Sequence, residues 1–247
     1  MNKLVKTIIA SIAAVIICIL SAFLFFPGII AKLYISHSDY YYNIDQTMGE
    51  YEHYGEKVPD IFKEVSALGT VLRIPGDSER MSEDTSDRKY YIFKSNEDNL
   101  KVNFVKNETL HYARYMWLLE LETDETIKQE LACVKDSDYG LNNYDQTAFI
   151  RNFTLDSIKT RGRGVIVNSI KYGTEKRVIC DYEQSWNYEN DDAVGFVDFY
   201  GCKDGVYSYV LALYDKNDLN DVHVVKMEST NEEMIWQIID SARIKTE

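Results

Sequence analysis

The sequence lacks the short motifs that mark common enzyme classes, and it has few prolines. HExxH, CxxC and Gly-x-Ser-x-Gly are all absent, as is the glycine motif of a βαβ unit. Only three of the 247 residues are prolines. These absences exclude the motif-defined metalloproteases, dithiol enzymes and serine hydrolases. We therefore predict no catalytic residue, no cofactor-binding residue and no metal ligand.

Positive charge is scarce after the first 32 residues. That part of the chain holds 24 basic and 40 acidic residues, a net charge of −16. Because neutralised phosphates supply most of the affinity for nucleic acid, nucleic acid is not an expected partner. The same charge argues against a domain that lies flat on anionic lipid. Solubility of an exposed domain accounts for the acidity, with cation binding as the alternative.

Charged side chains are also absent from Thr7 to Ala31. As a helix, the most apolar part, Ile8 to Phe26, is about 28 Å long and matches a hydrocarbon core of roughly 30 Å. A cleaved signal peptide is the alternative, although its apolar region is shorter and ends in small residues. A buried core helix would rarely be apolar on every face. We expect a retained transmembrane helix over residues 7–31.

Basic residues around this segment predict its orientation. Lys3 and Lys6 precede the span, whereas only Lys32 follows it closely and acidic residues come next. The positive-inside rule then favours a single-pass protein of the cell membrane with a cytoplasmic N-terminus. The expected organisation is a cytoplasmic stub over residues 1–6, a transmembrane helix over 7–31, a stalk over 32–58 and an extracytoplasmic domain over 59–247.

The first half of the domain alternates short apolar segments with turns. A helix from Pro59 to Gly69 is expected first, then a strand over Thr70–Ile74 and a loop over Asp77–Arg88. Further elements are expected as follows: a hairpin of residues 89–93 and 100–105, a helix or strand over 111–121, a helix over 125–134, and a helix over Gln146–Ile158 with Asp145 as its N-cap.

From Gly164 the apolar residues recur with a period of two. Strands are expected over Val165–Ile170, Lys176–Trp186, Val194–Gly201 and Val206–Tyr214. A last helix follows, with a capping box of Thr230 and Glu233 and an apolar side of Ile235, Ile238, Ile239 and Ala242. The order of strands and helices predicts an α+β fold, in which an antiparallel β-sheet meander packs with helices that include a C-terminal helix.

Two parts of this pattern resemble Mog1/PsbP-like domains. The meander, its strand VYSYVLALY (206–214) and a closing helix ending in IIDSARI (238–244) resemble their last half. The segment GTVLRIP (69–75) is similar to their start, so the resemblance covers about residues 69–244, with an insertion around 106–145. It implies a Mog1/PsbP-like α/β domain that serves in binding or assembly, and it brings no catalytic set.

Cysteine spacing predicts one disulfide. Cys18 lies in the expected span, which leaves Cys133, Cys180 and Cys202. If the hairpin turns about Asp191, Cys180 falls opposite Cys202, and the same register places Tyr182 opposite Tyr200 and Trp186 opposite Phe196. A disulfide that closes a loop of about 22 residues would stabilise the folded domain by roughly 3 kcal/mol, and an exported location permits the bond. Two buried free thiols are the alternative, because a one-residue slip separates the pair.

Several other polar groups have an ordinary explanation. His37-Ser38-Asp39 is adjacent in sequence, unlike a hydrolase triad, and fits a polar collar at the membrane. Asp215–Asp221 and Glu189–Asp192 fit turns better than cation sites. His53, His111 and His223 lack metal-ligand spacing. The basic cluster Arg161-Gly-Arg163-Gly could meet a phosphate or carboxylate but fits an exposed turn, and Asn107 and Asn152 begin N-glycosylation patterns.

Nineteen tyrosines and ten phenylalanines favour a sheet-rich domain and also suit a ligand surface. We expect a membrane-anchored, acidic, non-catalytic domain that binds a protein partner, or helps an assembly, in or on the membrane. The alternative is an exported, membrane-anchored, hydrolase-like enzyme whose carboxylates come from scattered positions. A third possibility is a structural module whose tyrosine-rich face packs on a neighbour.

Overall fold

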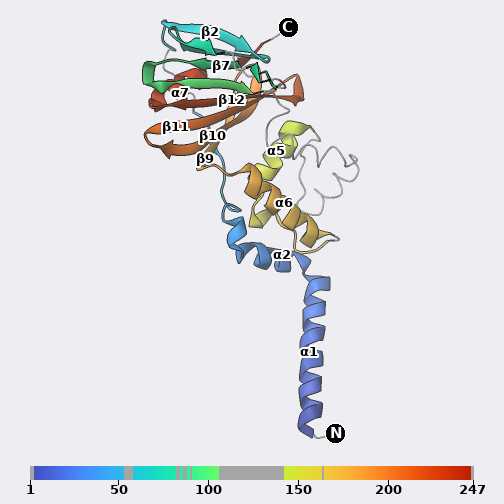
Figure 1. The fold of residues 1–247 in the computed structure, drawn as a ribbon. Coiled ribbons are helices and arrows are strands. Elements are labelled where there is room, and N and C mark those ends of the chain that lie inside the picture. Colours follow the sequence, from blue (N-terminus) through green and yellow to red (C-terminus); the bar gives the residue numbers. More distant parts are fainter. Residues whose placement is uncertain are drawn as a thin grey trace. The chain divides into compact units, whose positions relative to one another are not determined.

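The computed structural model describes residues 3–52, 58–81, 84–85, 88–89, 91–105, 142–162 and 164–245 (Figure 1). The chain divides into two compact units. Unit 1 comprises residues 1–46, 122–139 and 152–178, and unit 2 comprises residues 47–121, 140–151 and 179–247. The elements expected over 111–121 and 125–134, together with His53, His111, Cys133 and the Asn107 pattern, lie outside the described residues.

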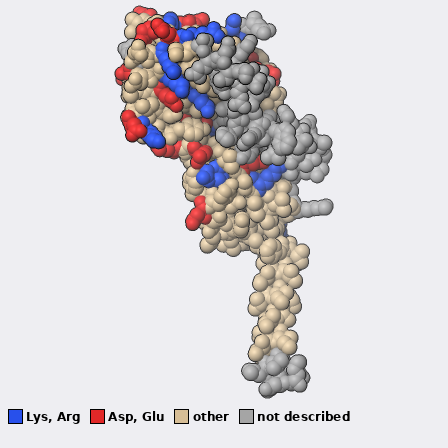
Figure 2. Space-filling view, in the orientation of Figure 1, with Lys and Arg blue, Asp and Glu red and all other residues tan. Residues whose placement is uncertain are grey.

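Unit 1 begins with the apolar segment, which forms helix α1 (Lys3–Phe25). Its stretch Thr7–Phe25 has a mean hydropathy of 2.9, and in the described part of the chain it alone is long and apolar enough to cross a membrane. Apolar side chains are exposed along the whole stretch, so water or lipid must cover them. In Figure 2 this rod carries no basic or acidic colour along its described length.

Four short elements complete the described part of unit 1. They are α2 (Pro27–Ser36), the 3-10 turn η1 (Asp39–Tyr41), the 3-10 turn η4 (Leu155–Ser157) and α6 (Val165–Ile179), the last of which ends at the border of unit 2. Pro27 stands at the start of α2, where a missing N–H costs nothing. The expected stalk therefore contains the end of α2, η1 and, in unit 2, strand β1.

Helix α6 corrects the prediction of strands over Val165–Ile170 and Lys176–Trp186. Buried positions recur along it at Val165, Tyr172, Lys176 and Ile179, which is a helical spacing. Lys176 is fully buried, and its Nζ donates to the carbonyls of Ile44, Gln46 and Phe153 at 3.0, 2.7 and 2.7 Å. Packing on this face overrides the strand preference of the β-branched residues that open the segment.

Unit 2 is built on an eight-stranded sheet of order β1-β9-β10-β11-β12-β8-β7-β4, antiparallel except where β1 pairs with β9. Its strands are β1 (Gly49–Glu50), β4 (Glu79–Met81), β7 (Tyr91–Lys94), β8 (Lys101–Val105), β9 (Gln184–Glu189), β10 (Ala193–Lys203), β11 (Val206–Asp215) and β12 (Asp218–Ser229). The 3-10 turn η2 (Glu97–Asn99) joins β7 to β8, as the predicted hairpin requires. A separate pair is formed by β5 (Asp84–Thr85) and β6 (Arg88–Lys89).

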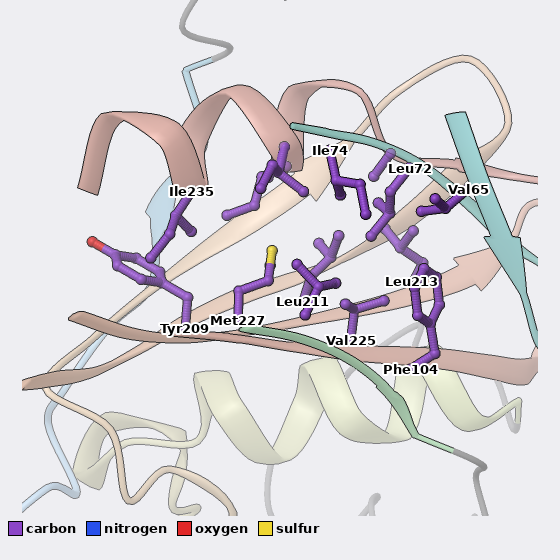
Figure 3. Packing of buried hydrophobic residues seen from close by; sticks show 14 of the residues in the cluster. Val65, Leu72, Ile74, Phe104, Tyr209, Leu211, Leu213, Val225, Met227 and Ile235 are labelled. Atoms are coloured by element: carbon purple, nitrogen blue, oxygen red, sulfur yellow. The ribbon is translucent and has the colours of Figure 1, made fainter. Parts of the chain in front are cut away.

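The main core lies on one face of this sheet, under helix α7 (Glu232–Asp240) and a three-stranded sheet (Figure 3). That smaller sheet has the order β13-β3-β2, with β2 (Phe62–Ala67), β3 (Thr70–Pro75) and β13 (Arg243–Ile244). The strand β3 was predicted, whereas the helix expected from Pro59 is instead the strand β2. The N-cap of α7 is Asn231, whose side chain accepts from Met234 N–H at 3.2 Å, and not Thr230.

Helix α5 (Asn143–Asn152) covers part of the opposite face of the sheet. The ring of Tyr144 stacks on Phe196, with centroids 5.4 Å apart, and Tyr214 Oη donates to Thr147 at 3.2 Å. A helix was expected over Gln146–Ile158; the observed helix starts three residues earlier and ends at Asn152. The described residues thus confirm the predicted α+β class, with a largely antiparallel sheet and a C-terminal helix.

Candidate functional site

A cluster of aromatic rings extends from the core of unit 2 to its surface. Strand pairing brings several of these rings to one face of the sheet, because side chains alternate between the two faces along each strand. Phe199 of β10 lies opposite Tyr209 of β11, and Trp186 of β9 lies opposite Val197 of β10. Helix α7 adds Trp236, and the chain after β1 adds Tyr51. We call these rings the aromatic cluster: Tyr51, Trp186, Phe199, Tyr207, Tyr209 and Trp236.

Trp236 lies at the centre of the aromatic cluster. Its ring centroid lies 4.8 Å from Tyr209, 5.3 Å from Trp186 and 5.6 Å from Tyr51. Tyr209 also contacts Phe199, at 4.8 Å. Tyr209 is buried, but the other five rings are half-buried. Packing therefore holds these five rings in place while part of each ring remains accessible. Rigid, half-exposed tryptophan and tyrosine rings are the side chains most enriched at protein interfaces.

Carboxylates surround the aromatic cluster. Tyr51 Oη donates to Asp240 at 2.6 Å, and Tyr209 Oη donates to Glu232 in the first turn of α7. Asn187 donates to Glu50 at 2.8 Å. These bonds orient the phenol rings and leave further acceptor capacity on each carboxylate. Aromatic faces beside carboxylates suit apolar and cationic groups of a partner.

A buried ion pair lies on the other face of the sheet. Arg151 of α5 donates to both carboxylate oxygens of Asp198, at 2.6 and 2.8 Å, and both residues are fully buried. Ser185 Oγ donates to Asp198 at 2.7 Å and accepts from Arg151 at 3.1 Å. The guanidinium lies 4.3 Å from the centroid of Phe196. This arrangement is closed to a substrate, so we regard it as structural.

The buried charges and rings alter protonation around this pair. Burial alone would lower the pKa of Arg151, but the charge and hydrogen bonds of Asp198 outweigh it, so the pKa is raised. Burial raises the pKa of the neighbouring Tyr182 well above its usual value, and Arg151 offsets this only in part. At neutral pH the site therefore holds one ion pair and a neutral phenol.

A small hollow opens between β8 and β12. Its volume is about 60 Å³, and it is lined by Lys101, Asn103, Lys226 and Glu228. Lys101 and Glu228 form an exposed ion pair at 3.7 Å. The hollow contains one carboxylate, whereas the hydrolase-like alternative requires at least two facing a substrate. Among the described residues, no group of three or more His, Cys, Asp or Glu could hold a metal ion.

The predicted disulfide depended on a register that the structure does not have. In the observed pairing Trp186 lies opposite Val197 and Phe196 opposite Asn187, a one-residue offset from the predicted register. Strand β9 begins only at Gln184, so Cys180 lies in the turn after α6 and outside the hairpin. Cys180 is buried, whereas Cys202 is exposed.

Native alkylation is expected to distinguish these two thiols. In the full chain purified without reductant, iodoacetamide should modify Cys202 rapidly and spare Cys180, which is 1% exposed. If no bond joins them, unfolding in denaturant should make both react. Peptide mass spectrometry measures both results. Resistance of both thiols after unfolding, relieved only by reduction, would establish the disulfide.

The remaining sequence candidates form local turns. Ser38 Oγ accepts from Tyr40 N–H at 3.4 Å, and His37 Nδ1 lies 2.9 Å from the carbonyl of Leu33. Asp215 and Asp218 accept from the N–H groups of Asn217 and Asn220, which is Asx-turn geometry. At the β9–β10 tip, Asn190 Oδ1 accepts from the backbone N–H groups of residues 192 and 193.

Neither the aromatic cluster nor the buried pair was predicted from the sequence. The rings of the aromatic cluster come from positions 51 to 236, so no local spacing connects them. Asp198 offered one usable signal, because a charged residue in the middle of an apolar strand requires a buried partner. Its partner, Arg151, lies within the helix predicted over Gln146–Ile158, but the sequence does not connect the two residues.

Comparisons with known proteins find similarity among solved structures. No protein-family model matches the chain, and no curated protein matches it. Among solved structures, cyanobacterial PsbP (CyanoP) from Synechocystis sp. PCC 6803 is similar, with 11% sequence identity and a TM-score of 0.34 over 80% of this chain and 98% of that one. The match agrees with the predicted resemblance to Mog1/PsbP-like domains.

Proposed function

We propose that this protein is a single-pass membrane protein whose unit 2 binds a protein partner, without catalysis, through the aromatic cluster. The anchor is α1, with its N-terminus in the cytoplasm and the rest of the chain outside the cell membrane. Its length, its apolar composition and its exposed side chains support this role, because lipid is the solvent such a surface requires.

The aromatic cluster is the observation that carries the partner role. Five half-buried rings, connected directly or through the buried Tyr209, would expose apolar surface to water at a cost, which a partner's apolar side chains would remove. The carboxylates of Glu50, Glu232 and Asp240 around them favour basic groups. We therefore expect a partner segment that presents apolar residues next to Lys or Arg, on a protein in or on the same membrane.

Site-specific photocrosslinking tests this function. The photoreactive residue p-benzoylphenylalanine replaces Tyr207, a half-buried ring of the aromatic cluster, in the full chain in intact membranes. Tyr200 is the matched control, since it is a tyrosine of unit 2 that is 42% exposed and lies near Asp198 and Arg151, the buried pair of the other face. Irradiation should give a discrete protein adduct at position 207 and not at position 200.

The chemistry of the adduct decides the outcome. Mass spectrometry should place the crosslink on a partner segment with apolar and basic residues, and high salt should weaken its formation because the carboxylates are accessible. Equal labelling at positions 207 and 200, or a crosslink to an acidic polar segment, would contradict the proposal.

A further inference from the structure

Helix α2 has an apolar side that the described protein leaves uncovered. Pro27, Gly28, Ala31 and Ile35 face the interior of unit 1 and are buried. On the other side, Phe26, Ile29 and Leu33 are 40%, 47% and 54% exposed. A surface helix in water normally presents polar residues there.

The position of α2 indicates what covers this side. Only Phe26 separates the end of α1 from the start of α2, and its N–H continues the helical bonding to the carbonyl of Ala22 at 2.9 Å. If α1 crosses the bilayer, the first turn of α2 must lie where the hydrocarbon core meets the headgroups. This turn is followed by three tyrosines that are about half exposed or more, as expected of an aromatic belt at the membrane interface: Tyr34, Tyr40 and Tyr42.

A basic loop packs on the same turn of α2. The N–H of Gly28 donates to the carbonyl of Thr160 at 3.1 Å, and a Cβ at position 28 would lie 1.7 Å from the carbonyl oxygen of Lys159. The guanidinium of Arg161 lies 5.2 Å from the ring centroid of Phe26. Lys159 and Arg161 are therefore at the level where α2 begins, and the close approach explains the glycine.

Charge in this part of the chain is opposite to the total. Residues 152–178 hold six basic and two acidic residues, although the whole chain has a net charge of −13. The acidity that argued against contact with anionic lipid therefore does not apply locally. Basic residues beside apolar and aromatic ones at a membrane surface match the chemistry of anionic headgroups.

We propose that α2 and the loop 158–162 bind anionic phospholipid headgroups of the bilayer that α1 crosses. Phe26, Ile29 and Leu33 enter the upper acyl region, while Lys159 and Arg161 contact the phosphates. The inference rests on the membrane anchoring in the proposed function, and it is independent of the partner bound by the aromatic cluster.

Lipid photocrosslinking of the full chain tests it. The protein carrying p-benzoylphenylalanine at Leu33 is reconstituted in vesicles of phosphatidylcholine and phosphatidylglycerol, floated, and irradiated. Lipid adducts at position 33 should contain phosphatidylglycerol above its mole fraction, by about fivefold for each basic residue in contact. Lys159→Glu with Arg161→Glu should abolish the enrichment, whereas Lys159→Arg with Arg161→Lys should retain it.

The arms separate two kinds of failure. Protein that does not float with the vesicles would contradict anchoring by α1, and with it the proposed function. If the protein floats, three results would overturn the headgroup proposal alone. They are phosphatidylglycerol adducts at its mole fraction in the vesicles, adducts that charge reversal does not change, and adducts with a second copy of the chain.

Discussion

Arg151→Met is expected to lower the free energy of unfolding of unit 2 by about 3–5 kcal/mol. The substitution leaves Asp198 fully buried without its cation, and an uncompensated buried charge is among the largest single penalties in a folded protein. Denaturant unfolding of the full chain in detergent measures the change. Trp186 and Trp236 provide the fluorescence signal, since both lie in the aromatic cluster of the same unit.

A double-mutant cycle identifies the mechanism. Asp198→Leu alone should cost a similar amount, because it leaves Arg151 buried and charged. The double variant should be far less destabilised than the sum of the two, since apolar side chains replace both charges together. Additive losses would show that the pair does not act as a unit and would contradict the assignment.

A surface ion pair supplies the matched control. Arg243 donates to Glu64, and their side chains are 54% and 55% exposed. Arg243→Met makes the same chemical change where water solvates the remaining charge, so we expect a loss below about 1 kcal/mol. A loss comparable to that of Arg151→Met would indicate that the arginine side chain contributes through its volume and not through its charge.

The sequence predicted elements whose local signals agree with their packing. The strand β3, the hairpin of β7 and β8 and the helix α7 each combine an apolar pattern with turn or cap residues at their ends. Asn231 caps α7 in place of the predicted Thr230, which instead donates to the carbonyl of Asp98 at 2.9 Å. A tertiary contact therefore decided which of two adjacent good cap residues is used.

Other elements depended on information that lies far away in the sequence. Helix α6 opens with Val165, Ile166 and Val167, whose local preference is for strands, and it is a helix because distant carbonyls enclose Lys176. The register of β9 and β10 was predicted one residue out, because the prediction favoured aromatic pairs, whereas the observed register places Trp186 opposite Val197 and Phe196 opposite Asn187. Strand β12 was missed where its polar start resembled a longer loop.

The aromatic cluster shows the same limit at the level of function. Its composition was visible as an excess of tyrosine, and a ligand surface was one of two interpretations. Position was the missing information, since strand pairing and α7 together decide which rings meet. The acidic total charge likewise concealed the basic segment 152–178, because a sum over the chain does not describe how charge is distributed on the folded protein.

Alkaline pH is expected to unfold unit 2 steeply between pH 10 and pH 12. Burial raises the pKa of Tyr188 to about 12 and that of Tyr214 to about 12, with smaller opposing effects from their hydrogen bonds to Asn190 and Thr147. In the unfolded chain both phenols ionise near pH 10. Their contribution to stability is therefore complete below pH 10 and is lost as the pH rises toward their folded pKa values.

The size of the loss follows from the two pKa values. A difference of about two between the folded and unfolded states corresponds to about 2.7 kcal/mol for each tyrosine, so the pair removes about 5 kcal/mol by pH 12. That is comparable to the whole stability of many domains.

Tyr214→Phe should cost about 1 kcal/mol at neutral pH, for its bond to Thr147, and should flatten the alkaline decline. Tyr42→Phe, at a position 66% exposed, should leave the profile unchanged. Tyrosinate absorbance and tryptophan fluorescence recorded together test the cause, since ionisation of these phenols without loss of the fold would contradict their burial.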